Sequence, residues 1–512
     1  MADESANKRI AKNTIFLYFR SLLIMAISLF SSRIILQALG VDDYGLYGAI
    51  GSIVMMFTII NNTLAVGTSR FLTFELGRND DVRLKKTFSA AFAMHAAMAL
   101  ILFVLLESVG LWFVNYKMQI PEGREFAANV IFQLSILSCM FSLTQVPYSA
   151  LIIAHEKMSV YAYVGIVEAV FKLALIFALL YVPFKDNLIA YGIIMVAWSV
   201  GLQIFYRFYC RKHFAESKLE ICRDKSVYKG MLTYSMWDFV GQFCATGNNQ
   251  GINVLINIFF GVSINAARAV AYQVENALMQ FSNNFLTAVN PQIVKAYAQN
   301  DHKRFFELIF ESGKYAYYLL FLVSLPVFLE TKYILSIWLV EVPDYTVLFL
   351  RCVIAITLFT TANRPVVLGV HATGNVKILN LTSGVYSAGT FLPIVYVFYK
   401  TGLPVWMCFV MQGFNRMVCT YLEMRALYKN VKFNRLSYLY NVFVKACFVS
   451  LLSCVVPVLF LNLMEEGLLR FVVVCAVSVL YSSAVIFFLG VSADARMKVI
   501  SFVKRKFGNA AH

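Results

Sequence analysis

Residues 14–39 read TIFLYFRSLLIMAISLFSSRIILQAL, a run of 26 residues that holds only two charged side chains, Arg20 and Arg33. A membrane-spanning helix needs about 20 predominantly apolar residues, so this run is long enough to cross a bilayer. It is too long for the core of a signal peptide and has no A-x-A end, which predicts a retained first span. Membrane-spanning helices are therefore expected to determine the fold.

Further runs of spanning length follow, and they are continuously apolar rather than alternating, which excludes a β-barrel. The chain of 512 residues is 60% hydrophobic and 14% charged, whereas soluble domains carry about 25% charged residues. This composition excludes a soluble enzyme and a disordered chain, and it predicts an all-α polytopic membrane protein of about fourteen transmembrane helices. The candidate spans are 14–39, 44–70, 87–114, 127–154, 159–182, 188–209, 230–260, 262–294, 311–329, 345–370, 376–399, 404–426, 438–463 and 467–490.

Basic residues are distributed unevenly among the loops between these spans. With the N-terminus in the cytoplasm, 29 of the 44 Lys and Arg residues fall in cytoplasmic segments, 5 in outside loops and 10 in spans. The positive-inside rule then predicts that both termini are cytoplasmic. Basic loops that face anionic lipid headgroups account for the net charge of +16, so nucleic-acid binding is not expected.

The longest basic loop follows the sixth span and divides the chain. Because six is an even number, it predicts two six-helix lobes in the same orientation, followed by two extra C-terminal helices. The predicted segments are an N-terminal lobe (1–206), a basic cytoplasmic linker (207–229), a C-terminal lobe (230–426), an appended helix pair (427–490) and a basic cytoplasmic tail (491–512).

Three arginines, Arg268, Arg364 and Arg416, lie deep within predicted spans. Ionisable groups at that depth are costly and usually face a hydrated cavity. Glu275 follows Arg268 by seven residues and shares its helix face. Since ten basic residues and five acidic residues lie within spans, the cavity is expected to be electropositive. The planar guanidinium group binds phosphate, so the expected ligand is an anion or carries phosphate.

Other span arginines have a structural alternative. Arg33, Arg70, Arg351 and Arg470 are close to span ends, where long basic side chains can reach the membrane surface.

Acidic residues in the spans are candidates for coupling transport to H+ or Na+, namely Glu168, Asp238 and Glu275. Lys172 lies four residues after Glu168, and the two side chains could instead neutralise each other on one helix face. Asp238 lies in an unusually polar span, for which helix–helix hydrogen bonding is the alternative.

The sequence contains no motif for metal or nucleotide chemistry. The ten Cys form no CxxC pair, and the six His have no metal-binding spacing, so neither a metal nor a cofactor is expected. Without a Walker A sequence, transport by this chain would be driven by an ion gradient, the membrane potential or removal of product. No catalytic residue is expected.

Four segments resemble the multidrug/oligosaccharidyl-lipid/polysaccharide exporter superfamily, and within it the Wzx-like polysaccharide-biosynthesis flippases. The segments are NTIFLYFRSLLIMAISLFSSRIILQALGVDDYGLYGAIGSIVMMF (13–57), NNTLAVGTSRFLTFELG (61–77), VPYSALIIAHEKMSVYAYVGIVEAVFKL (146–173) and NQGINVLINIFFGVSINAARAVAYQV (249–274).

The resemblance implies two lobes around a central cavity that opens alternately to each side of a bacterial inner membrane. The cargo would be an oligosaccharide on undecaprenyl pyrophosphate, destined for O-antigen or capsule, with a polymerase and glycosyltransferases as partners. By helix and approximate depth, Arg20, Arg70 and Arg268 match cavity arginines of related lipid II flippases, and Arg33 is a further candidate. Asp42 or Asp43 occupies the position of an acidic residue after the first helix that acts in coupling or gating.

Two other functions are weighed against the flippase. A cation-coupled multidrug antiporter of the same superfamily would need an acidic cavity, which the surplus of arginine disfavours. A polytopic polysaccharide polymerase or ligase generally carries a large periplasmic loop, whereas the predicted outside loops here are short.

Overall fold

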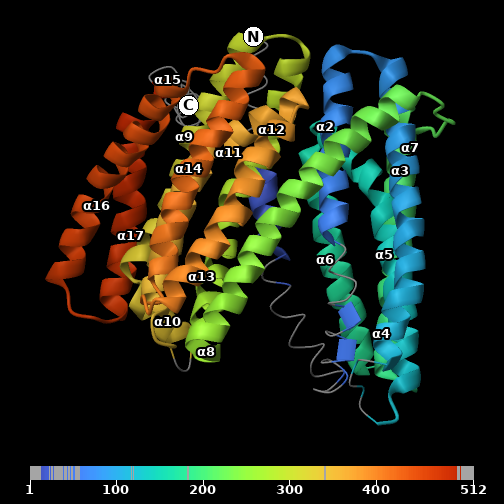
Figure 1. The fold of residues 1–512 in the computed structure, drawn as a ribbon, viewed down its shortest axis with the longest axis horizontal. Coiled ribbons are helices and arrows are strands. Elements are labelled where there is room, and N and C mark those ends of the chain that lie inside the picture. The colour runs from blue at the N-terminus through green and yellow to red at the C-terminus, as the bar shows by residue number, and fades with distance from the viewer. Residues whose placement is uncertain are drawn as a thin grey trace, which may run out of the picture. The chain divides into compact units, whose positions relative to one another are not determined.

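The computed structural model describes residues 58–492 except 117, 119, 121, 182, 183, 340 and 341. It also describes residues 496 and 497 and part of the first fifty-one residues, chiefly 13–21. Every regular element in this part of the chain is helical (Figure 1). The predicted all-α fold is therefore confirmed. Eight of the described helices are long and apolar enough to cross a membrane, and the count of fourteen spans stays a prediction.

The chain divides into two compact units. Unit 1 comprises Met1–Phe243 and Asn290–His302, and unit 2 comprises Cys244–Val289 and Lys303–His512. The elements of unit 1 are α2 (Thr58–Arg78), α3 (Asp81–Leu105), η1 (Leu106–Gly110), α4 (Leu111–Tyr116), α5 (Glu125–Ala154), α6 (Met158–Tyr181), α7 (Asn187–His213), η2 (Ala215–Ser217) and the ends of α8 (Lys225–Ala298). Those of unit 2 are the middle of α8, α9 (His302–Leu329), α10 (Thr331–Trp338), α11 (Thr346–Thr373), α12 (Lys377–Leu379), η3 (Asn380–Gly384), η4 (Ser387–Phe391), α13 (Leu392–Lys400), α14 (Met407–Val431), α15 (Arg435–Tyr438), η5 (Leu439–Val444), α16 (Lys445–Leu463), α17 (Leu468–Val485) and η6 (Ile486–Gly490).

The long element α8 consists of two helices joined at Gly261. This glycine has φ 84°, a left-handed conformation that residues with a Cβ rarely adopt. It lies between the predicted spans 230–260 and 262–294. The end of α8 is tied to unit 1 by Lys295, whose Nζ lies 2.5 Å from Oε1 of the buried Glu156.

Within unit 1, α5 packs against α2, α3 and α7. Its buried residues Phe132 and Tyr148 form part of the core. In unit 2, α11 packs against α14, and α16 pairs with α17 at one edge of that unit (Figure 1). Apolar residues of α9, including Tyr318, contact this terminal pair.

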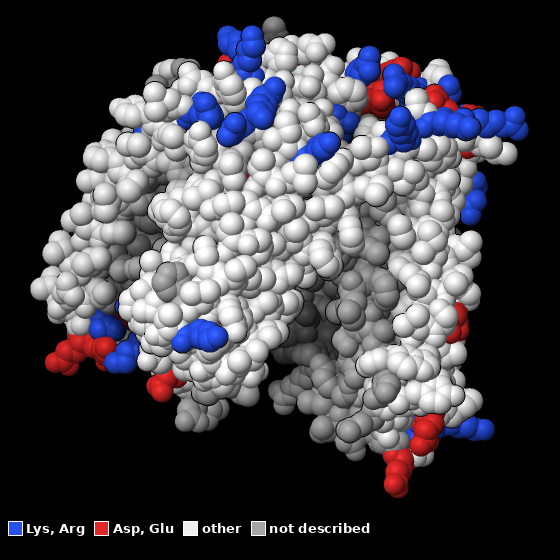
Figure 2. Space-filling model, viewed as in Figure 1, with Lys and Arg blue, Asp and Glu red and all other residues white. Residues whose placement is uncertain are grey.

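Large apolar side chains also cover the outside of the helices. Phe208 on α7 and Leu480 on α17 are mostly exposed. Figure 2 shows a broad uncharged band on the displayed face, with Lys and Arg concentrated toward one end of each unit. Such a band suits contact with lipid hydrocarbon. The backbone groups of a helix are hydrogen-bonded within the helix, so a helix with apolar side chains exposes no unsatisfied polar group to lipid.

Candidate functional site

Arg268 is the centre of a polar cluster in unit 2. Its side chain is only 3% exposed. Nη2 donates to Oδ1 of Asn249 at 2.7 Å, and Nη1 donates to Oδ1 of Asn253. The guanidinium carbon lies 4.3 Å from the centre of the Tyr272 ring. Since Asn249 and Asn253 precede Gly261 and Arg268 follows it, the turn in α8 folds its two halves alongside each other and holds the arginine between them.

Glu275 lies further along the same half of α8 and accepts a hydrogen bond from the hydroxyl of Thr357 on α11. Arg416, Arg268 and Arg364 all act electrostatically on its carboxylate. The spacing of Arg268 and Glu275 predicted a shared face, and the structure places the two charges within interaction range.

A second carboxylate belongs to the same cluster. Glu423 on α14 accepts a hydrogen bond of 2.6 Å from Nδ2 of Asn363 on α11. Arg416 and Arg364 act on Glu423 through space. Among the described residues, none of the three arginines forms a direct ion pair with either glutamate. Three guanidinium groups face two carboxylates, so the cluster carries a positive surplus.

Arg364 differs from its neighbours in exposure. It lies within α11, a 28-residue helix apolar enough to span a membrane, yet its side chain is exposed. A charged side chain at this depth is stable only where water or a polar ligand reaches it. The guanidinium of Arg364 is therefore the part of the cluster most available to a ligand.

Uncharged hydrogen-bonding groups extend the cluster. Ser387 accepts hydrogen bonds from Nδ2 of Asn415 at 2.9 Å and from Nδ2 of Asn248 at 3.2 Å. Ser387 begins η4, a π-helical segment, and such segments often occur at functional sites. Tyr272 and Gln412 are also hydrogen-bonded, at 3.3 Å. Amides and hydroxyls of this kind suit the hydroxyl groups of sugars.

Unit 1 contains a smaller polar group around Arg20. The guanidinium carbon lies 4.6 Å from the centre of the Tyr161 ring. Arg20 is also the strongest charged influence on Glu168, ahead of Lys172. Within the described part of the chain Glu168 and Lys172 form no direct ion pair, but Lys172 still acts on the Glu168 carboxylate through space.

Gly165 provides the space for Arg20 and offers a test of its position. A Cβ at residue 165 would lie 2.2 Å from Nε of Arg20, so Gly165→Ala is expected to displace the guanidinium and reduce transport. Because the displaced group is a flexible side chain, the protein should still fold. Transport in reconstituted vesicles and the apparent Tm measure the two effects. Gly201→Ala, where a Cβ meets no atom within 4 Å, is the matched control. Unchanged transport in Gly165→Ala would remove Arg20 from the site.

The remaining predicted residues are more dispersed. Arg70 is buried on α2. Its guanidinium carbon lies 4.6 Å from the ring centre of Phe71 and 4.7 Å from that of Phe74. Asp238 is buried in the same unit. Arg33 and Asp42 lie outside the described residues. The predicted head-group arginines are thus divided, with Arg20 and Arg70 in unit 1 and Arg268, Arg364 and Arg416 in unit 2.

Asp43, a predicted gating residue, belongs to a charged triad in unit 1. Nε of Arg124 donates to Oδ1 of Asp43 at 2.8 Å, and Nη1 of Arg124 donates to Oδ2 of Asp186 at 2.7 Å. Asp186 also caps α7 by accepting from the backbone N–H groups of Leu188 and Ile189. The triad therefore ties together three segments that are far apart in the sequence.

The triad predicts a loss of stability in acid. Burial raises the pKa of Asp186, but the hydrogen bonds from Arg124 and the backbone outweigh it and hold the pKa below its ordinary value of 3.8. A carboxyl with a lowered pKa stabilises the folded state above its ordinary pKa and loses that effect as the pH falls through the lowered value. The apparent Tm should fall in acid, and less steeply in Arg124→Gln than in the unmodified protein. Parallel pH profiles would contradict this prediction.

Two further span arginines have structural roles. Arg351 donates to the carbonyl oxygens of Phe328 and Leu329 at 3.2 and 3.4 Å. Both Nε and Nη2 of Arg470 lie 2.9 Å from the Glu330 carboxylate. Arg470 thus has a structural role, because the buried Glu330 carboxylate holds its guanidinium. No group of side chains that could hold a metal ion occurs in the described ranges.

Several residues of the cluster were not predicted as site residues. Glu423 is one of the five acidic residues within the predicted spans, and nothing local in the sequence links Asn363 or Thr357 to a carboxylate on another helix. Arg124, in the triad of unit 1, lies in the predicted outside loop between the spans 87–114 and 127–154. Its pairing with Asp43 and Asp186 joins positions 81 and 62 residues apart, which periodicity within one helix does not encode.

Comparisons with known proteins agree with this architecture. The solved structure of an outward-facing multidrug resistance MATE family transporter of the MOP superfamily matches with a TM-score of 0.70 at 12% identity, covering 83% of this chain and 96% of that one. A variant of the Vibrio cholerae MATE transporter VcmN matches with a TM-score of 0.67 at 15% identity, covering 85% and 99%. A MOP superfamily transporter from Pyrococcus furiosus, described as having a binding pocket of reversed polarity, matches with a TM-score of 0.67 at 11% identity, covering 83% and 96%.

These similarities show a MATE-like fold and confirm that part of the expectation. No curated protein matches the chain. The family model for polysaccharide biosynthesis proteins matches residues 10–297, more than half of the chain. The chain therefore belongs to the polysaccharide biosynthesis protein family, and it has the fold of the MATE transporters of the MOP superfamily.

Proposed function

We propose that this protein is a flippase that moves an oligosaccharide linked to undecaprenyl pyrophosphate across a bacterial inner membrane, for the synthesis of O-antigen or capsule. The single observation that carries the proposal is the cluster of Arg268, Arg364 and Arg416, which has a positive surplus within helices of a membrane protein. Membership of a polysaccharide biosynthesis family supports a glycan as cargo.

The chemistry of the cluster suits such a cargo. A pyrophosphate and its sugars cannot cross about 30 Å of hydrocarbon without losing their hydration. Guanidinium groups replace that hydration with charge-assisted hydrogen bonds to phosphate. The amides near Ser387 would bind sugar hydroxyls, while the polyprenyl tail stays in lipid. Alternating exposure of the binding site to the two membrane faces completes the transfer without breaking a covalent bond.

The other predicted residues keep proposed roles in this mechanism. Arg20 and Arg70 would contact the head group from unit 1, together with Arg33. Glu168, with Lys172, and likewise Asp238 and Glu275 would couple the cycle to H+ or Na+, with Asp42 and Asp43 as gating residues. A polymerase and glycosyltransferases would consume and supply the glycan, and both termini would be cytoplasmic.

A multidrug antiporter is the second candidate, because the similar structures include MATE transporters, one of them described as a multidrug resistance transporter. A site for lipophilic cations needs a negative surplus. The cluster in unit 2 has the opposite sign, which favours a phosphate-bearing cargo.

Reconstitution separates these candidates. The purified protein in liposomes should move fluorescent polyprenyl-pyrophosphate oligosaccharide between leaflets, and empty liposomes should not. A lipophilic dye cation should not be transported. Dye transport without movement of the lipid-linked glycan would overturn the proposal in favour of the antiporter.

A further inference from the structure

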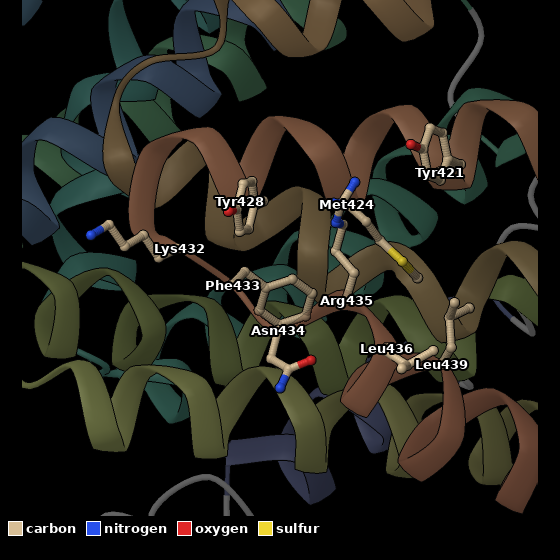
Figure 3. Close-up of a pocket in the computed structure, with 9 residues that line it drawn as sticks. All are labelled: Tyr421, Met424, Tyr428, Lys432, Phe433, Asn434, Arg435, Leu436 and Leu439. Carbon is tan, nitrogen blue, oxygen red and sulfur yellow. The ribbon is translucent and has the colours of Figure 1, made fainter.

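A pocket of about 530 Å³ opens in unit 2 where α14 turns into α15 (Figure 3). Tyr421 and Tyr428 line it from α14, and Leu436 and Leu439 line it from the following helix. Lys432 lies in the turn that follows α14, and Arg435 is the first residue of α15. None of these residues belongs to the Arg268 cluster.

The basic side chains of this pocket are not neutralised within the described part of the chain. The guanidinium carbon of Arg435 lies 4.9 Å from the ring centre of Tyr428 and 5.7 Å from that of Tyr421. Figure 3 shows it directed toward α14. Stacking on aromatic faces fixes the guanidinium but leaves its N–H donors available. Neither Lys432 nor Arg435 forms an ion pair with a described carboxylate. Figure 3 shows Lys432 directed away from Arg435 along the turn, so the pocket presents the Arg435 guanidinium to an anion and carries a second positive charge at its rim.

The opposite wall of the pocket is apolar and open. Leu436 is 77% exposed, and Leu439 is also exposed. Both leucines lie in the first turns of Arg435–Leu463, a helix apolar enough to span a membrane. They are thus placed at the boundary between hydrocarbon and water. Exposed leucines here are stable if acyl chains cover them.

We propose that this pocket binds an anionic phospholipid, with its phosphate at Arg435, the charge of Lys432 at the rim adding to the attraction, and its acyl chains against Leu436 and Leu439. Basic pockets next to transmembrane helices hold anionic lipid headgroups through this combination of charge and apolar wall. A soluble phosphate would use the charges but would leave the leucines uncovered, so a lipid fits both walls.

Native mass spectrometry of the full-length protein in detergent tests the site. The protein is titrated with phosphatidylglycerol and, separately, with phosphatidylcholine of the same acyl chains. We expect Lys432→Gln together with Arg435→Gln to weaken phosphatidylglycerol binding about 25-fold, since each basic residue near anionic lipid contributes about fivefold. Lys432→Asn alone should weaken phosphatidylglycerol binding about fivefold. Lys432 is an exposed turn residue with φ 49°, a backbone conformation that asparagine tolerates, so this variant should fold normally.

The matched control is Arg425→Gln with Lys429→Gln, which removes the same charge from the same end of α14 but does not alter the pocket lining. This control should bind phosphatidylglycerol as the unmodified protein does. Equal loss in both double variants, or equal binding of phosphatidylcholine, would overturn the proposal. So would displacement of the lipid by the same concentration of glycerol phosphate, which would identify a soluble phosphate as the ligand.

Discussion

Arg268→Ala is expected to reduce transport of the lipid-linked oligosaccharide by at least about 100-fold, because it removes one of the three positive charges of the proposed head-group site. It also removes the two charge-assisted hydrogen bonds to Asn249 and Asn253, worth about 1.5–3 kcal/mol each, that hold the two halves of α8 together at the site. Arg416→Ala should have a similar effect, since both guanidinium groups act on Glu275 and contribute to the same positive surplus. Transport into liposomes, together with the amount of surface polysaccharide in cells, measures the loss.

The protein level in the membrane must remain unchanged for this result to report on the site. Arg351→Ala is the matched control, because it also removes one arginine from a span of unit 2. Its guanidinium, however, bonds to the carbonyl oxygens of Phe328 and Leu329 rather than to the cluster. Arg268→Lys keeps the charge but loses the planar fork, so it should retain part of the activity. Normal polysaccharide in both alanine variants would exclude the cluster as the head-group site.

The parts of this site that the sequence predicted are those encoded within one helix. Arg268 and Glu275 are two turns apart, so their shared face follows from helical geometry alone. The break at Gly261 likewise separates two apolar runs that are each long enough to span a membrane. The long apolar runs therefore predicted the class of fold, because lipid requires the helices that face it to carry apolar side chains and to satisfy their own backbone hydrogen bonds.

The parts that could not be predicted depend on pairing between distant helices. Glu423 meets Asn363 across 60 positions, and Glu330 meets Arg470 across 140. Hydropathy scores each of these residues as an isolated polar interruption of a span. Whether such a residue faces a ligand or a protein partner depends on tertiary packing, so the sequence alone does not identify Glu330 as the partner of Arg470.

Breaking the ion pair between Glu330 and Arg470 is expected to produce the largest loss of stability. Glu330 is 1% exposed and Arg470 is 12% exposed, so removing one partner leaves an uncompensated charge in a buried site. Such a loss costs about 3–5 kcal/mol. Arg470→Met and Glu330→Met should each lower the apparent Tm of the purified protein in detergent, because the pair connects α17 to the start of α10.

The double variant, in which both residues are Met, should recover most of this loss, since replacing both charges with apolar groups removes the desolvation penalty as well as the attraction. The nearby pair of Lys332 and Glu466 is the matched control. Its atoms are 3.3 Å apart, but the lysine side chain is 74% exposed, and exposed pairs contribute about 0–1 kcal/mol. Lys332→Met should therefore leave the Tm almost unchanged. If Arg470→Met had as small an effect, the pair would not hold α17 to α10 within unit 2. If the double variant were as unstable as the singles, the loss would come from packing rather than from an unpaired buried charge.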